Sequence, residues 1–186
     1  YFEQDSISNL KNIPSDFGKK CLIVTGPNIE KSPATISCKK ILKSCGYEYK
    51  IFSKVDTEPT ASHVNDIVKL FSESNSEFIL GIGGGSAIDL AKGIATLATN
   101  HGKAIEYRGF PKGLNPSIPV IAVPSTTGTG TELTYNAVFI DTDSMTKLGI
   151  NTTNNYPVLS LLDPEIVSSA PRSVIIASGT GALGRS

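Results

Sequence analysis

The sequence contains few of the residue types that build metal centres and nucleophilic catalytic sites. It has two histidines and three cysteines in 186 residues, and neither His63 nor His101 has a carboxylate or cysteine at metal-ligand spacing. We therefore expect no metal site, and no Ser-His-Asp or Cys-His arrangement is apparent. Cys38 and Cys45 fall on one apolar helix face, where core packing accounts for them. An odd cysteine count without a C-x-x-C pair indicates a reducing compartment, expected to be the cytoplasm.

An excess of charge of either sign is also lacking. The 17 lysines and arginines balance the 17 acidic residues, which argues against a general nucleic-acid or anionic-membrane surface. No apolar run approaches the roughly 20 residues that span a bilayer, and the first residues do not resemble a signal peptide. The content of 39% hydrophobic and 18% charged residues is typical of a soluble globular chain with one well-packed domain.

Apolar runs alternate with helical periodicities along the chain. After a polar, irregular or short-helical lead-in at residues 1–18, strands are expected at residues 21–25, 47–52, 78–82, 118–123, 135–140 and 158–162. Helices are expected at residues 32–45, from Thr60 or Ser62 to about Phe71, and at residues 86–99. This order predicts an α/β fold with a Rossmann-like parallel sheet, flanking helices and right-handed crossovers.

A run of three glycines, residues 83–85, follows the strand at 78–82 and precedes a helix rich in Ala, Ile and Leu. Glycines let the backbone approach a ligand closely, and a helix N-terminus attracts anions. We interpret this stretch as a pyrophosphate cradle, in which Ser86 would cap the helix and Asp89 would complete a capping box. The alternative is a tight strand-to-helix turn with ordinary capping.

The helix after the glycines carries a weakly apolar stripe. Asp89, Lys92, Gly93 and Thr96 share one side of a helix that is otherwise Ile-, Leu- and Ala-rich. This pattern predicts a helix that is buried on most sides, with one stripe near a polar cleft.

A second loop, residues 125–132, carries five hydroxyl side chains and two glycines. Such residues can donate to phosphate or ribose oxygens without bulk, although the loop alone is equally a helix-capping turn. Both loops follow the carboxyl ends of expected parallel strands, where ligands bind, so we expect one shared crevice. Residues 179–184 also match G-x-G-x-x-G, but no strand–turn–helix unit surrounds them, and we do not interpret them as a phosphate loop.

Three motifs together carry a family resemblance: GGGSAIDLAK at residues 83–92, PSTTGTGTE at 124–132 and DPE at 163–165. In order and spacing they resemble the iron-containing alcohol dehydrogenase family over residues 15–183. The resemblance implies an NAD(P)-binding α/β domain followed by an all-helical domain that holds iron or zinc. It also implies hydride transfer between the nicotinamide and a small alcohol or aldehyde.

The resemblance further implies a set of cofactor-binding residues: Gly26, Gly84, Gly85, Ser86, Asp89, Ser125, Thr126, Thr129, Asn136 and Lys147. The residues after the third strand would hold the pyrophosphate, those of the hydroxyl-rich loop would lie near adenine and ribose, and Asn136 and Lys147 would face the cleft. Gly26 stands where family members that prefer NAD often have an aspartate. A neutral Gly26 leaves room for a 2′-phosphate, which favours NADP slightly over NAD.

The sequence departs from the family at the metal ligands. Gly181 and Arg185 stand where the family has its first two ligands, Asp and His, and neither residue can bind a metal. We therefore expect one dinucleotide-binding domain over residues 1–186, with residues 165–186 as the start of the helical domain or a truncated tail. The rest of the all-helical domain is expected to be absent.

The expected function is that of an oxidoreductase domain that is inactive as an isolated half. The alternatives are a non-catalytic nucleotide-binding module or scaffold, and a dehydroquinate-synthase-like lyase. An exposed apolar face is also expected where a second domain would pack, so a homo-oligomer is a possible assembly.

Overall fold

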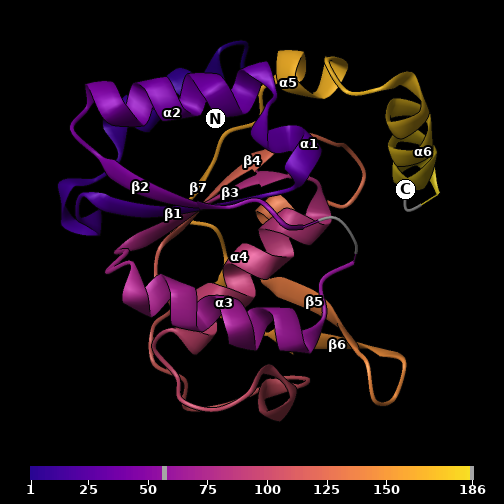
Figure 1. Ribbon diagram of the computed structural model, residues 1–186. Helices are drawn as coiled ribbons and strands as arrows, with labels where there is room; N and C mark the ends of the chain where they lie inside the picture. Colours follow the sequence, from indigo (N-terminus) through magenta and orange to yellow (C-terminus); the bar gives the residue numbers. More distant parts are fainter. Residues whose placement is uncertain (56–57, 185–186) are drawn as a thin grey trace.

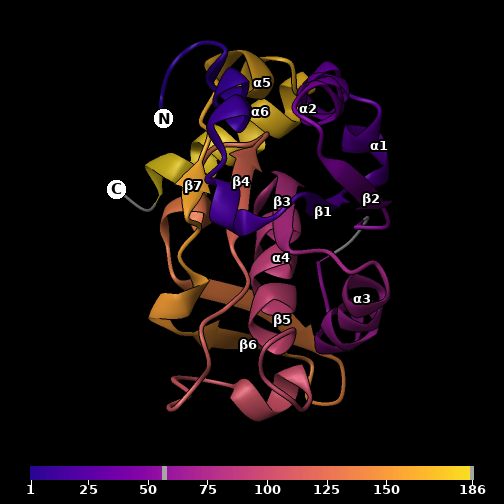
Figure 2. The ribbon, with the colours of Figure 1, turned by 90° about the vertical axis from the view of Figure 1, so that its left-hand side faces the viewer.

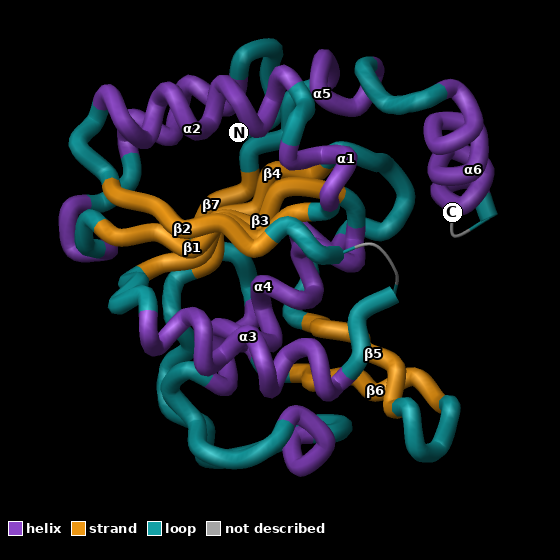
Figure 3. The backbone as a smooth tube through the Cα atoms, in the orientation of Figure 1, coloured by secondary structure: helices purple, strands orange, loops and turns teal. Residues whose placement is uncertain are grey.

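The computed structural model describes residues 1–55 and 58–184, and its centre is a five-stranded parallel sheet (Figures 1 and 3). The strand order is β2-β1-β3-β4-β7. The strands are β1 Lys20–Thr25, β2 Glu48–Phe52, β3 Phe78–Gly83, β4 Val120–Pro124 and β7 Leu159–Ser160. The predicted parallel α/β sheet is therefore confirmed.

Helices cover both faces of the sheet (Figures 1 and 2). The first face carries α2 (Pro33–Ser44), and the second carries α3 (Ala61–Glu73) and α4 (Gly85–Leu97). Successive strand side chains point to opposite faces, so Cys21 packs in the core under α2 while Leu22 packs in the core with α3 and α4. Strands β1, β3 and β4 are buried on both faces, which explains why they read as continuous apolar runs. The edge strand β2 is only partly buried.

Several helix ends lie where the sequence predicts them. Ser32 caps α2 by accepting from the Thr35 N–H, and Gly46 follows that helix with a φ of 75°. Of the two candidate caps for α3, Thr60 is the one used, in a capping box with His63. His63 thus has a structural partner within its own helix.

The cysteines pack in the core as expected. Cys21 and Cys38 are buried, and Cys45 is half-buried against the same cluster. Burial raises the pKa of the Cys38 thiol to about 12, so this thiol stays protonated at neutral pH. Within the described residues all three cysteines are free thiols.

The second strand of a hairpin was not predicted. β5 (Asn136–Asp141) pairs in antiparallel fashion with β6 (Thr146–Asn151), whereas the sequence indicated only a strand at 135–140 and a turn after it. The hairpin packs on α4 rather than joining the main sheet (Figure 1). It therefore covers one flank of the helix that follows the glycine run.

The chain begins with two 3-10 turns, Ser6–Asn12 and Ser15–Phe17, which agrees with the predicted lead-in. After β1 comes the short helix α1 (Pro27–Glu30), and after β7 come α5 (Pro164–Ser168) and α6 (Arg172–Leu183). None of the helices in the described part of the chain is long and apolar enough to cross a membrane.

Candidate functional site

The two predicted loops leave the sheet side by side. In the β3–β4 register Gly83 lies opposite Pro124, so the glycine run and the hydroxyl-rich loop begin at the same edge. The Ser125 N–H donates to the Gly83 carbonyl at 2.8 Å and ties the two loop starts together. The shared crevice expected from the sequence thus has its geometric basis in two adjacent parallel strands.

The glycines allow the two loops to approach closely. A Cβ added at Gly84 would lie 3.1 Å from Thr126 Oγ1, and one at Gly85 would lie 3.0 Å from Thr129 Cγ2. Both distances are tighter than ordinary van der Waals contact. Glycine at these positions therefore removes bulk at the junction of the loops as well as beside the cleft.

The predicted capping of α4 is wrong. The N-cap is Gly84, Ser86 is already the second helical residue, and no capping hydrogen bond from a described side chain is formed. Asp89 instead accepts a hydrogen bond from the Thr131 hydroxyl. The helix begins one residue earlier than predicted, which leaves its first backbone N–H groups without a side-chain cap.

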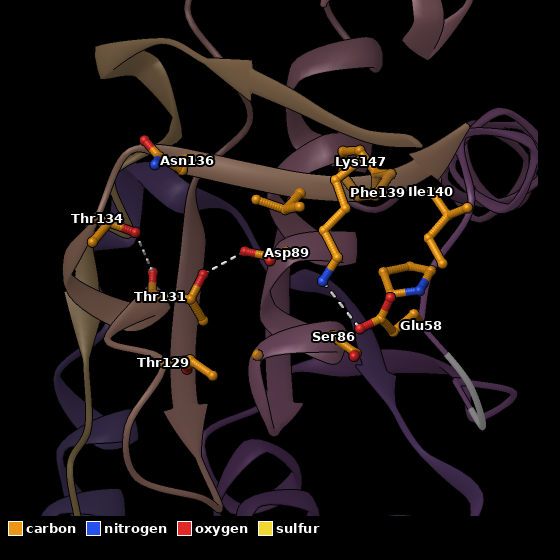
Figure 4. Close-up of a pocket in the computed structure, with 13 residues that line it drawn as sticks. Glu58, Ser86, Asp89, Thr129, Thr131, Thr134, Asn136, Phe139, Ile140 and Lys147 are labelled. Carbon is orange, nitrogen blue, oxygen red and sulfur yellow. Dashed lines mark hydrogen bonds and ion pairs between the residues drawn. The ribbon is translucent and has the colours of Figure 1, made fainter. Parts of the chain in front are cut away.

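A cleft of about 440 Å³ opens beside this helix start (Figure 4). Its walls come from α4, the hydroxyl-rich loop, the β5–β6 hairpin and the segment before α3. The lining residues are Glu58, Pro59, Gly85, Ser86, Asp89, Thr129, Thr131, Thr134, Asn136, Val138, Phe139, Ile140 and Lys147.

Six of the ten sequence-predicted site residues line this cleft: Gly85, Ser86, Asp89, Thr129, Asn136 and Lys147. Gly84 and Thr126 face each other next to it, and Thr126 lines a separate groove toward α6. Ser125, the first residue of the loop, is 5% exposed and does not line the cleft. The roles assigned to these residues in cofactor binding stay predictions.

Gly26 lies apart from the cleft lining, at the end of β1. A Cβ at this position would come within 2.8 Å of the Val55 carbonyl oxygen, so any side chain would require the backbone to shift. Close packing therefore explains the glycine without reference to a 2′-phosphate. Gly26 therefore does not favour NADP over NAD.

Sequence reasoning missed the part of the cleft contributed by Glu58. Its carboxylate lies 3.2 Å from Lys147 Nζ, with 56% and 68% of the two side chains exposed (Figure 4). An ion pair this exposed contributes little to stability, but it places the Glu58 carboxylate at the lining of the cleft. No sequence signal links Glu58 to Lys147, whereas Thr131 lies within the hydroxyl-rich loop and could have been included.

The stripe of Asp89, Lys92, Gly93 and Thr96 does not face a cleft as predicted, apart from Asp89. Lys92 and Thr96 have no exposed surface, and a Cβ at Gly93 would lie 2.5 Å from Phe139 Cζ. Phe139 of β5 covers Gly93, and residues 131–136 cover Lys92. Thr96 lies against Ser117 and Asn155. Burial of α4 on most sides is confirmed.

Asp89 has an unusual environment for a carboxylate. Burial raises its pKa to about 6, against the opposing effects of the Thr131 hydroxyl and the Lys92 charge. The Asp89 carboxyl group therefore holds its proton more tightly in the folded state than in the unfolded state. As pH rises from about 4 to about 6, this group lowers the free energy of unfolding.

We expect this loss to disappear in Asp89→Asn. The asparagine oxygen can still accept from Thr131 but does not titrate. The free energy of unfolding is measured with urea at a series of pH values. Between about pH 4 and 6 it should fall in wild type relative to Asp89→Asn, and above about pH 6 the difference between the two proteins should stay constant. Other acidic groups are common to both proteins and cancel. A constant difference across that range would contradict the assignment.

Metal-binding side chains do not gather in the described part of the chain. Among residues 1–55 and 58–184 no group of three or more His, Cys, Asp or Glu could hold an ion. Gly181 lies within α6, as does most of the 179–184 motif, and Arg185 lies outside the described residues. The described residues therefore do not fit a metal centre.

A family model described as iron-containing alcohol dehydrogenase matches residues 1–164. The chain belongs to this family. The family match ends where α5 begins and includes the sheet, the hairpin and both loops.

Two curated relatives and one solved structure illustrate the similarity. Alcohol dehydrogenase 4 of Schizosaccharomyces pombe is 36% identical over 93% of this chain and 41% of its own length. The NAD-dependent methanol dehydrogenase of Bacillus methanolicus is 33% identical over 89% of this chain and 43% of its own. A crystal structure of 1,3-propanediol oxidoreductase superposes with a TM-score of 0.92 at 32% identity, covering 98% of this chain and 48% of that one. The chain thus spans about half the length of the relatives that it matches.

Proposed function

We propose that this chain is the NAD(P)-binding part of an oxidoreductase that interconverts a small alcohol and its aldehyde. The observation that carries the proposal is the start of α4. No described side chain caps it, and its first residues, Gly85 and Ser86, line the cleft. Backbone N–H groups and the helix dipole at such a position favour a pyrophosphate. Gly84, Gly85 and Ser86 would hold it.

The remaining lining residues suit the rest of a dinucleotide. Thr129 and Asn136 offer neutral donors and acceptors for ribose hydroxyls, and Lys147 offers a cation. Lys147 would leave Glu58 when it meets a ligand phosphate, since both side chains are exposed and their ion pair is weak. The nicotinamide would accept or donate the hydride.

The similar methanol and propanediol enzymes support a small alcohol or aldehyde as substrate. In the family, iron or zinc would polarise its oxygen, and a helical domain would supply the ligands. Residues 165–186 would begin that domain, and the rest of the chain would form the dinucleotide domain. Apolar side chains on α6 support this division, because a second domain could pack on them: Ile176 is 58% exposed and Leu183 is 79% exposed.

Both NAD and NADP are expected to bind. The turn at Gly26 has no carboxylate to repel a 2′-phosphate and no arginine to attract it.

A cytoplasmic location is supported by the three free cysteines among the described residues. A homo-oligomer also remains a prediction.

Titration calorimetry with NAD, NADP, ADP and ATP tests the proposal. We expect the dinucleotides to bind more tightly than the mononucleotides, because only they can occupy the cleft on both sides of the pyrophosphate. Failure of every dinucleotide to bind would rule the cradle out. Alcohol turnover is measured separately with added divalent metal. Binding of a dinucleotide without turnover of any alcohol would favour a non-catalytic nucleotide-binding module. Gly181, which has no side chain to bind a metal, is consistent with that outcome.

A further inference from the structure

Lys92 is a fully buried cation directly behind one wall of the cleft. Its side chain has 0% exposure, and its Nζ donates to the carbonyls of Thr134 at 2.7 Å and Asn136 at 3.0 Å. It also donates to the Thr131 carbonyl, and the Thr131 hydroxyl oxygen lies 3.2 Å away. Three backbone carbonyls from one short segment thus converge on one ammonium group.

This cage offsets the cost of burying the charge. An ammonium group has three N–H donors, which matches the three carbonyls. Asp89, one turn earlier on α4, and Glu132 add attraction of opposite charge. Burial lowers the pKa of Lys92 to about 8, so the ammonium form still predominates at neutral pH.

The caged segment is itself part of the cleft. Thr131, Thr134 and Asn136 all line it, and their carbonyls point back to Lys92. The segment runs from a 3-10 turn into β5 and so has no continuous strand or helix to hold its backbone. The Lys92 ammonium supplies that support.

We propose that Lys92 is a positioning residue, an internal cation that shapes the wall formed by residues 131–136 for the ligand of the cleft. The inference rests on the proposed function for the identity of that ligand. A direct contact between Lys92 and a phosphate does not fit, because the side chain has no exposed surface and its donors meet protein carbonyls. Simple packing does not fit either, since an apolar substitute would leave buried carbonyls unpaired.

The first test is Lys92→Met, with Lys69→Met as the matched control because Lys69 is an exposed lysine on α3. We expect NAD affinity to fall at least about tenfold in Lys92→Met, with faster amide exchange across residues 131–136, while Lys69→Met behaves as wild type. Wild-type affinity and wild-type protection in a folded Lys92→Met variant would overturn the proposal.

The second test restores the cation from outside. Lys92→Ala removes three carbons and the ammonium group, which propylammonium replaces atom for atom. We expect propylammonium to restore amide protection at residues 131–136 and NAD affinity. Tetramethylammonium at equal ionic strength should not, because it has no N–H donor. Loss of protection in Lys92→Ala without restoration by propylammonium would contradict the role of the cation.

The two readouts separate this inference from the proposed function. If wild type binds no dinucleotide, the proposed function fails, while amide exchange still decides whether Lys92 orders the segment. If neither variant folds unaided, the far-ultraviolet circular dichroism of Lys92→Ala is followed as propylammonium is added, with tetramethylammonium as the control. Recovery of folded signal with propylammonium alone supports the proposal, and no recovery overturns it.

Discussion

Replacing Gly93 with alanine should destabilise the fold by about 2 kcal/mol, although alanine is the better helix former. The added Cβ would lie 2.5 Å from Phe139 Cζ and 3.1 Å from Cε2. Phe139 is 1% exposed and belongs to the core that α4 shares with the hairpin, so the ring has no free space to enter. The gain of up to about 1 kcal/mol in helix propensity is smaller than the cost of overpacking.

Gly179→Ala in α6 is the matched control for this substitution. It is also a helical glycine, but a Cβ there has nothing within 4 Å, so we expect unchanged or slightly increased stability. Urea unfolding measures both variants through a shift in midpoint at constant m. Phe139→Leu should recover part of the loss when combined with Gly93→Ala. If the two alanine variants were equally stable, the close α4–hairpin packing would be wrong.

The Gly93–Phe139 contact illustrates what the sequence could not provide. Helical periodicity predicted α4 and its burial, because both depend on residues close together in the chain. The polar stripe on α4 was assigned to a cleft because the strand at 135–140 was predicted without its place in the fold, and β5 packs directly against α4. Its partner β6 was not predicted, because it buries only Leu148 and Ile150, too few apolar residues for a clear alternating pattern. Lys92 could not be recognised as buried until its cover was known.

The start of α4 shows a second limit. A serine followed three residues later by an acid is a good capping-box signal, yet Gly84 is the N-cap here. Glycine can occupy that position with extended backbone, as Gly84 does at φ −76° and ψ −172°. The sequence of this stretch is compatible with an N-cap at either Gly84 or Ser86. The location of the cleft was nevertheless predictable, because it depends on which strands are adjacent and parallel.

Gly85→Val should reduce dinucleotide affinity by about 100-fold or more. Gly85 is the first residue of α4 and lines the cleft, so a branched side chain there adds bulk beside the N–H groups proposed to hold the pyrophosphate. The same Cβ also presses on Thr129 Cγ2 at 3.0 Å. One substitution therefore has two effects, on the ligand site and on the junction of the loops, and the experiment must separate them.

Combining Gly85→Val with Thr129→Ala makes this separation. Removing Cγ2 and Oγ1 of Thr129 relieves most of the contact, so the double variant should regain unfolding free energy. Because Thr129 also lines the cleft, NAD affinity is compared with that of Thr129→Ala alone, and the double variant should bind more weakly. Gly179→Val, on a helix position with nothing near its Cβ, controls for the general cost of a valine in a helix. Calorimetry with NAD and urea unfolding are run on all variants. If the double variant bound NAD as Thr129→Ala does, Gly85 would serve only the packing of the two loops, and the pyrophosphate would have to bind elsewhere.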